Sequence, residues 1–145
     1  MTVIRDALEE DAATLAQLLG QLGYPARADE MGARLVALRQ YPQALAFVAE
    51  QQGDVVGLVT CHMFPSIHAS APVAWLTTLI VDRHHCGLGI GRRLCRAAEV
   101  WARERGAQRV SVSSGAQRDD AHAFYGRIGY AQTGMRLTKV LGEPE

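Results

Sequence analysis

The strongest chemical signal in the sequence is the glycine segment CGLGIG at residues 86–91. An apolar, β-branched run precedes it, and a run with helical periodicity follows it. N–H groups in the first turn of a helix lack intrahelical partners and carry partial positive charge, and glycine lets an anion approach them without a Cβ clash. The segment therefore predicts a phosphate or pyrophosphate site made of backbone amides, to which Arg92 and Arg93 add charge.

Three interpretations of the glycine segment compete. A dinucleotide site would place GxGxxG near the first strand with an acid about 20 residues further on, whereas this segment comes late and the region near residue 110 reads VSVSS. A Walker loop needs GxxxxGK followed by Ser or Thr, and the segment has no such lysine. The structural interpretation is a glycine turn that only lets a helix pack close to a strand.

The residues just before these glycines raise two further hypotheses. His84, His85 and Cys86 suggest a metal, but adjacent residues rarely face one ion and no distant partner pair is evident, so no metal site is predicted. A thiol near a helix N-terminus can have a lowered pKa, which makes Cys86 a candidate reactive thiol that a cofactor would shield. An inert small residue is the favoured interpretation of Cys86.

Composition excludes several classes of protein. The 145 residues are 48% hydrophobic and 21% charged with zero formal net charge, which fits one soluble domain and not a nucleic-acid binder. Cys61, Cys86 and Cys95 form no CxxC and are odd in number, so reduced thiols in a cytoplasm fit better than a disulfide scaffold or a zinc site. The N-terminus lacks the apolar centre of a signal peptide, and no window approaches a membrane helix.

Alternating strands and helices must position these residues. Strand patterns cover residues 2–5, 44–50, 55–64, 73–81, 109–114 and 130–141, and helical patterns cover 9–24, 28–40, 89–105 and 119–129. The order predicts an α/β domain with a mixed sheet, in which a hairpin-rich first half joins a right-handed βαβ unit in the second half.

Several segments together resemble the GNAT superfamily of N-acetyltransferases. Residues 86–91 fill the six places of its acetyl-coenzyme A signature, Arg/Gln-x-x-Gly-x-Gly/Ala, and LTTLIVDRHH resembles the fourth strand and its exit. FYGRIGY (124–130) resembles the FYxxxGF/Y segment about 35 residues downstream, and IRDALEEDAATLAQLL resembles the opening IRxAxxxDxxxLxxL. The resemblance implies one domain over residues 1–145 in the α/β (α+β) class. Its mixed, mostly antiparallel sheet would have six to seven strands, about four flanking helices and a splay between strands 4 and 5.

The resemblance also implies acetyl-CoA as acetyl donor and co-substrate. In the family, free backbone groups of the splayed fourth strand pair with the pantetheine arm as an added strand would. This places Leu79, Ile80 and Val81 beside the pantetheine and thioester, although sheet core alone is the other interpretation of the three. The implied cofactor-binding residues are Leu79, Ile80, Val81, Cys86, Gly87, Leu88, Gly89, Ile90, Gly91, Arg92 and Arg118.

One residue departs from the family pattern. The first place of the signature is usually Arg or Gln, and here it is Cys86. A side-chain contact to the cofactor is therefore expected to be missing, while binding by amides does not need it. Arg92 or Arg118 is the expected substitute charge; Arg118 lies where many relatives carry Asn.

Acetyl transfer to an amine needs a neutral amine, a donor to the oxyanion and a proton for the leaving thiolate. The resemblance assigns Tyr125 as the general acid, while its place on an apolar helical face also fits core packing. His122, on the same helix, is a candidate cofactor contact or a solvent-facing residue. The oxyanion donor implied by the family is a backbone N–H near Leu79 or Ile80.

The general base is not evident, because the strand at 73–81 has no carboxylate. His62 and His68 have suitable intrinsic pKa values and are the candidate bases. Thr77 or Thr78 could hold a water, so a water relay without a single base is at least as well supported. Asp82 is interpreted as a turn or capping residue.

The predicted function is acetyl transfer from acetyl-CoA to a primary amine by direct attack in a ternary complex. The acceptor would be a small molecule or a peptide, walled by the two N-terminal helices and residues 65–72, which carry no dense acidic patch for a polycation. The missing strand-four Glu and Cys86 support an alternative, a non-catalytic acyl-CoA-binding module, and Tyr125 opposes it. A nucleotide-binding domain of another class is a third hypothesis. A homodimer is expected from relatives; no nucleic-acid or membrane partner is expected.

Overall fold

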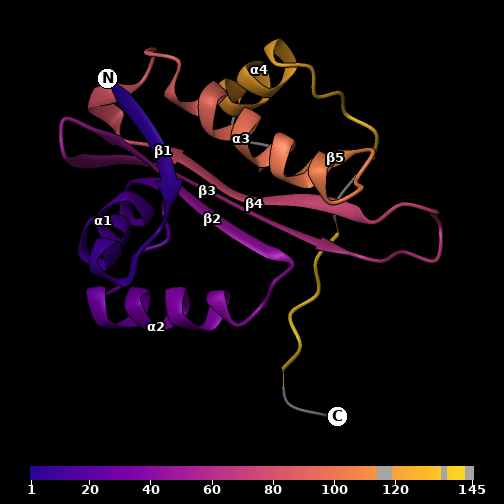
Figure 1. The fold of residues 1–145 in the computed structure, drawn as a ribbon, viewed down its shortest axis with the longest axis horizontal. Helices are drawn as coiled ribbons and strands as arrows, with labels where there is room; N and C mark the ends of the chain where they lie inside the picture. The colour runs from indigo at the N-terminus through magenta and orange to yellow at the C-terminus, as the bar shows by residue number, and fades with distance from the viewer. Residues whose placement is uncertain (114–118, 135–136, 143–145) are drawn as a thin grey trace. The chain divides into compact units, whose positions relative to one another are not determined.

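The computed structural model describes residues 1–113, 119–134 and 137–142, and the chain forms two compact units, Met1–Val112 and Ser113–Glu145. The first unit holds most of the regular structure (Figure 1). Its strands are β1 (Thr2–Asp6), β2 (Ala44–Gln51), β3 (Asp54–Phe64), β4 (Val73–Val81) and β5 (Val110–Val112). Its helices are α1 (Ala12–Leu22), α2 (Ala28–Arg39) and α3 (Ile90–Glu104), and its 3-10 turns are η1 (Glu9–Asp11) and η2 (Arg83–His85). The second unit holds α4 (Asp119–Arg127).

In the described part of the chain, five strands form one sheet in the order β1-β2-β3-β4-β5. The pairs from β1 to β4 are antiparallel, and β4 and β5 are parallel. Because α3 connects the parallel pair, the predicted βαβ unit is confirmed. β2 and β3 form the predicted hairpin, whose turn contains Gly53 at φ +86°.

Helices cover both faces of this sheet (Figure 1). Leu58 of β3 and Ile80 of β4 belong to one core cluster with Leu15 of α1 and Leu35 of α2. Gly57, one residue before Leu58, lies against α3 instead. Because side chains alternate between the faces of a strand, β3 and β4 contribute to two cores and their apolar runs are long.

An ion pair fixes the entry into α1. Asp11 is only 7% exposed, and its carboxylate accepts hydrogen bonds from Arg5 of β1 at 2.9 and 3.0 Å and from the Leu8 backbone N–H at 2.7 Å. The Arg5 guanidinium holds the pKa of Asp11 below its usual value. Arg5 also donates to Glu50 of β2 at 2.7 Å. Arg5 thereby ties β1 both to β2 and to the start of α1.

The predicted strand at residues 130–141 is not found. Its described residues, 130–134 and 137–141, lie outside any helix or strand, so the described sheet has five strands and not six to seven. β5 is also shorter than the predicted 109–114. A strand exists only where a neighbour pairs with its backbone groups, and an alternating pattern within the segment cannot supply that neighbour. The other predicted helices and strands differ from the observed ones mainly at their ends.

Candidate active site

The glycine segment forms a loop that ends as the first turn of α3. After η2, Cys86 is extended, Gly87 has φ +82°, and Gly89, the N-cap of α3, has φ +79°. L-residues rarely adopt such positive φ angles. A Cβ added to Gly87 or Gly89 would meet no described atom within 4 Å. These two glycines therefore serve the backbone conformation and leave open space above the loop, which does not fit the interpretation as a turn for close packing.

The amides of this loop are available to a ligand. Arg93 N–H donates to Gly89 O at 3.1 Å. For the N–H groups of residues 87–92, the described residues supply no backbone acceptor. A helix N-terminus with unpaired amides attracts anions through its partial positive charge. Ile90, 2% exposed, holds the first turn in the core, while Leu88 is 62% exposed.

The close approach of α3 depends on Gly57 of β3, which was not among the residues predicted to matter. A Cβ at Gly57 would lie 2.9 Å from Leu94 Cδ1, 3.2 Å from Ile80 O and 3.4 Å from Ile90 Cγ2. Because Gly57 has no Cβ, the first turns of α3 can pack directly on the sheet beside the end of β4. A glycine inside the strand pattern VVGLVT was the available signal, because such a glycine often marks a close approach.

Beyond residues 74–76, one edge of β4 has no strand partner among the described residues. Among the described residues, β5 pairs with β4 only at residues 74–76. Asp82 N–H donates to Val56 O of β3 at 2.8 Å. Because bonding and non-bonding residues alternate along an antiparallel pair, the N–H and C=O of Ile80 also face β3, and those of Leu79 and Val81 face the opposite edge.

A β-bulge separates the paired and unpaired parts of β4. The register shifts between Thr60 and Cys61 of β3, which oppose Thr78 and Leu76, so Thr77 is the extra residue. The Thr77 and Thr60 hydroxyl oxygens are 2.6 Å apart. Bulges re-aim side chains and often adjoin active sites. The bulge places a hydroxyl pair where the free edge begins.

The two candidate bases lie in different surroundings. His62 of β3 is half-buried, pairs across the sheet with Trp75 and stacks on Phe64 with ring centroids 5.3 Å apart. It shares a sheet face with Thr60, two residues earlier. His68 is exposed in the loop after β3, where its N–H donates to Ser66 Oγ at 3.2 Å. Of the two histidines, only His62 therefore shares a sheet face with Thr60 of the hydroxyl pair.

Asp82 is a turn residue, as predicted from the sequence. His85 N–H donates to its carbonyl at 2.8 Å, and His85 Nδ1 lies 2.8 Å from its carboxylate. Gln21 of α1 donates to the other carboxylate oxygen at 2.8 Å. The hydrogen bonds from Gln21 and His85 lower the pKa of Asp82.

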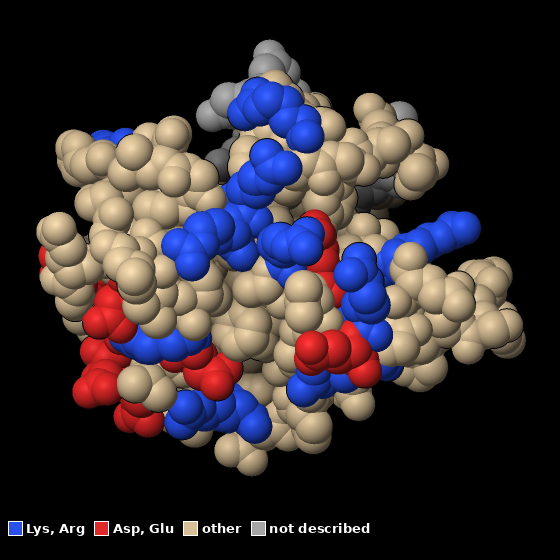
Figure 2. Space-filling model, turned by 45° about the horizontal axis from the view of Figure 1, so that its top comes forward, with Lys and Arg blue, Asp and Glu red and all other residues tan. Residues whose placement is uncertain are grey.

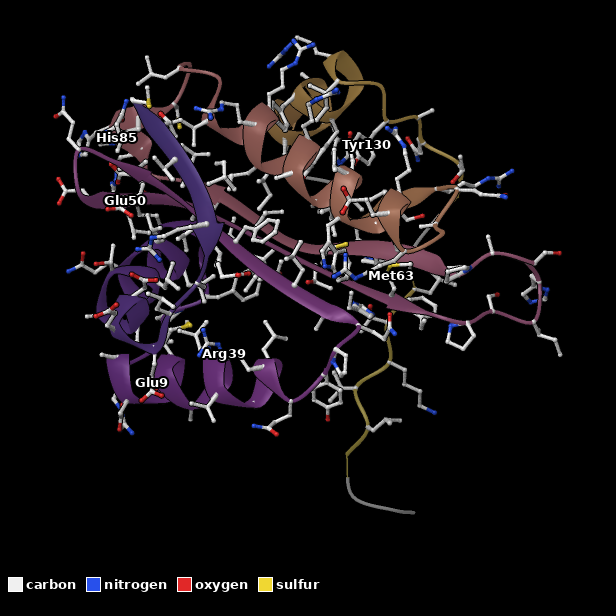
Figure 3. All side chains as sticks on the ribbon, in the orientation of Figure 1. Glu9, Arg39, Glu50, Met63, His85 and Tyr130 are labelled. Atoms are coloured by element: carbon white, nitrogen blue, oxygen red, sulfur yellow. The ribbon has the colours of Figure 1, made fainter. Side chains whose placement is uncertain are left out.

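Tyr125 lies in the second unit, in α4. Its ring is half-buried and makes edge contacts with Phe124 and Tyr130, at centroid distances of 5.4 and 5.6 Å. Tyr130, labelled in Figure 3, donates its N–H to Tyr125 O at 2.9 Å. His122 is exposed. Arg118, predicted to contact the cofactor, lies outside the described residues.

Exposed arginines follow α3 beyond the glycine loop. They are Arg92, Arg93, Arg96 and Arg103, and blue side chains gather across the face that Figure 2 shows. Within the ranges that the structure describes, no three metal-binding side chains cluster. The helices described here are also too short or too polar to cross a membrane.

Alkylation of the folded protein by iodoacetamide is expected to modify Cys86 well before Cys61 and Cys95. Burial raises the pKa of Cys61 to about 11 and that of Cys95 to about 12, so near neutral pH both thiols stay protonated, and the thiolate is the nucleophile. Cys86 is exposed. Peptide mapping by mass spectrometry after brief labelling would measure the order. Earlier labelling of Cys61 would contradict it, and protection of Cys86 by acetyl-CoA would support cofactor binding at the loop.

Comparison with known proteins gives consistent matches. A family model described as "Acetyltransferase (GNAT) family" matches residues 12–130. Aminoalkylphosphonate N-acetyltransferase of Salmonella typhimurium is 34% identical over 143 residues, which cover 95% of this chain and 90% of that protein. Aminoglycoside N(6')-acetyltransferase type 1 of Stenotrophomonas maltophilia is 29% identical over 134 residues, covering 90% and 86%.

A solved structure shows the same fold. The aminoglycoside N-acetyltransferase AAC(6')-Iy, in complex with CoA, superposes with a TM-score of 0.85 at 17% sequence identity. The match covers 97% of this chain and 95% of that one.

Proposed function

The chain belongs to the acetyltransferase (GNAT) family, and on that premise we propose that it transfers the acetyl group of acetyl-CoA to the primary amine of a small molecule. Family membership makes the protein an acyltransferase with acetyl-CoA as donor, which decides against a non-catalytic module. Because the family match runs from residue 12 to 130, we treat the whole chain as one acetyltransferase domain.

The observation that carries this proposal is the run of amides at residues 87–92 that have no backbone acceptor among the described residues, with open space at Gly87 and Gly89. In the proposal, these N–H groups bind the CoA diphosphate and the α3 dipole adds to the attraction. Arg92 lies in the same turn and supplies charge near the phosphates. Amides suffice for this role, so Cys86 at the usual Arg or Gln place does not abolish it.

The pantetheine arm is proposed to run along the free edge of β4. The outward N–H and C=O groups of Leu79 and Val81 are available for strand-like pairing. The buried Ile80 side chain stays in the core with α1 and α2. Because the N–H of Ile80 faces β3, the alternation supports Leu79, and not Ile80, as the oxyanion donor.

For the proton transfers, we propose Tyr125 as the acid that protonates the leaving CoA thiolate. His62 is the better-supported base, because it shares a face of β3 with Thr60, whose hydroxyl pairs with that of Thr77 at the start of the free edge. Those hydroxyls suit a water that relays the ammonium proton to the imidazole. His68 remains a weaker candidate, since its described contact is only with its own loop.

A small pocket near the sheet face that carries Thr60 and His62 supports a particular class of acceptor. It measures about 270 Å³ and is lined by Asp6, Leu35, Leu38, Arg39, Tyr41, Pro42, Ala44 and Ala46. Ala44 and Ala46 pair with His62 and Thr60 across the β2–β3 ladder. The lining carries one arginine, Arg39, and one acid, Asp6, so it offers a partner to an anionic group and to an amine but no cluster of acids. A small amine that also bears an anionic group fits this lining better than a polycationic aminoglycoside.

Release of free CoA thiol across a panel of amines tests the function, with mass spectrometry of the acetylated product. Aminoethylphosphonate is expected to be acetylated, and ethylamine, its matched amine without the anion, to have a higher KM. Arg39→Met is expected to raise KM for aminoethylphosphonate only. Acetylation of an aminoglycoside in preference to both would overturn the acceptor class, and no turnover with any amine would count against a small-molecule acceptor.

Two further expectations belong to the proposal. The thiols of Cys61, Cys86 and Cys95 are all free, which supports a reducing, cytoplasmic location. A homodimer is proposed only because many members of the family form dimers. Light scattering would measure the molar mass in solution and so test it.

A further inference from the structure

A hydrogen-bonded cluster ties α1 to the start of the cofactor loop. The Gln21 side chain uses both ends of its amide: Nε2 donates to Asp82 Oδ1 at 2.8 Å, and Oε1 accepts from Arg83 N–H at 3.0 Å. Asp82 Oδ2 lies 2.8 Å from His85 Nδ1. Since a carboxylate only accepts, the Nδ1 atom of His85 carries the proton. We call Gln21, Asp82 and His85 the loop clamp.

The loop clamp lies where the chain leaves the sheet for the glycines (Figure 3 labels His85). Asp82 is anchored to β3 through its N–H, and its carbonyl accepts from His85 N–H. Cys86, the next residue after His85, begins the loop. At its far end the loop is fixed by the buried Ile90. Between these ends, Gly87 and Gly89 allow many backbone conformations. The clamp reduces this freedom because it fixes the position at which the loop begins.

We propose that Gln21, Asp82 and His85 are positioning residues for the cofactor. They hold η2 so that the amides of residues 87–92 face one diphosphate group before it binds. An ordered loop binds its ligand more tightly because less ordering remains for the binding step. This inference rests on the proposed acetyl-CoA site. It adds a role for Gln21, which lies in the last turn of α1, one of the two helices expected to wall the acceptor.

Gln21→Met tests the clamp, because methionine keeps the length of the side chain and removes both hydrogen bonds. Its KM for acetyl-CoA is expected to rise about five- to tenfold, the scale of a lost hydrogen-bond pair, with kcat within about twofold. Gln17→Met is the matched control, since Gln17 is exposed on α1 one turn earlier, and it is expected to behave as wild type.

The donor distinguishes positioning from general damage. S-acetylpantetheine lacks the diphosphate, so Gln21→Met is expected to leave its KM unchanged. An equal rise in KM for both donors would overturn the inference. So would a loss of stability large enough to explain the rise in KM, seen as a melting temperature lower than that of Gln17→Met. So would an unchanged KM for acetyl-CoA in a wild type that binds it. Failure of the wild type to bind acetyl-CoA would instead overturn the proposed function, and this inference with it.

Conservative replacement gives a second readout. His85→Ala removes the donor to Asp82 and is expected to raise KM for acetyl-CoA, again without affecting S-acetylpantetheine. His85→Asn places an amide N–H near the position of Nδ1 and is expected to recover most of the loss. If Asn restored nothing relative to Ala, the His85–Asp82 bond would have no part in positioning.

Discussion

Replacement of Tyr125 by phenylalanine is expected to lower kcat by about 10²-fold, the lower end of what a positioned general acid contributes. The proposed role of the hydroxyl is to protonate the CoA thiolate as it leaves. Phenylalanine keeps the ring and hence its edge contacts with Phe124 and Tyr130. KM for acetyl-CoA is therefore expected to change little. Steady-state kinetics with the best amine of the panel, over a range of pH, would measure the loss and the change in the basic limb of the profile.

Tyr130→Phe is the control for this experiment. Tyr130 contacts the Tyr125 ring in the same unit, so its replacement makes the same chemical change beside the proposed acid. Its kcat is expected to stay near that of wild type. Equal losses in the two variants, or a Tyr125→Phe enzyme with an unaltered rate and pH profile, would remove Tyr125 from the mechanism and leave it a packing residue of α4.

Gly57→Ala is expected to destabilise the protein by about 1–3 kcal/mol, the usual cost of an overpacked core. The new Cβ would lie 2.9 Å from Leu94 Cδ1 and 3.2 Å from Ile80 O. The Leu94 side chain can rotate, but the carbonyl belongs to the β3–β4 ladder and moves only with the strand. For a chain of this size, the melting temperature is expected to fall by roughly 3–10 °C. Calorimetry or thermal fluorescence would measure it.

The same substitution is expected to raise KM for acetyl-CoA, because Ile90 and Leu94 form the first turns of α3 and carry the loop with them. Gly20→Ala is the matched control. A Cβ on Gly20 of α1 would meet no described atom within 4 Å, and alanine is the better helix former. Its melting temperature is expected to equal or exceed that of wild type. A Gly57→Ala protein as stable as wild type would show that α3 does not depend on this contact.

Local patterns in the sequence were sufficient to predict most of the fold. The apolar period of residues 89–105 and the β-branched run at 73–81 correspond to α3 and β4, which carry the loop and the free edge. The positive φ angles of Gly87 and Gly89 agree with the need for glycine there. These features depend on neighbours within a few residues, so the sequence displays them directly.

The parts that were missed depend on contacts between distant segments. Gln21 and Asp82 are 61 residues apart, and neither has a neighbour that signals the bond. The need for glycine at Gly57 arises from a helix that follows about 30 residues later. The prediction of a final strand at residues 130–141 was wrong because it used only the alternation within that segment. A strand also needs a neighbouring segment to pair with, and the alternation says nothing about that neighbour. The assignments of Tyr125 and His62 stay predictions, because their roles depend on bound substrates.

The single extra residue at Thr77 changes which layer of the molecule each half of β4 belongs to. Leu76 and Ile80 are four apart and would share a face in a regular strand, but Leu76 opposes Cys61 and Ile80 opposes Leu58, an odd number of residues apart on β3. The bulge thus inverts the parity of the strand. If the same sequence formed a regular strand, a one-residue slip of the pairing beyond Thr77 would turn Ile80 out of its core and exchange the inward and outward amides along the free edge.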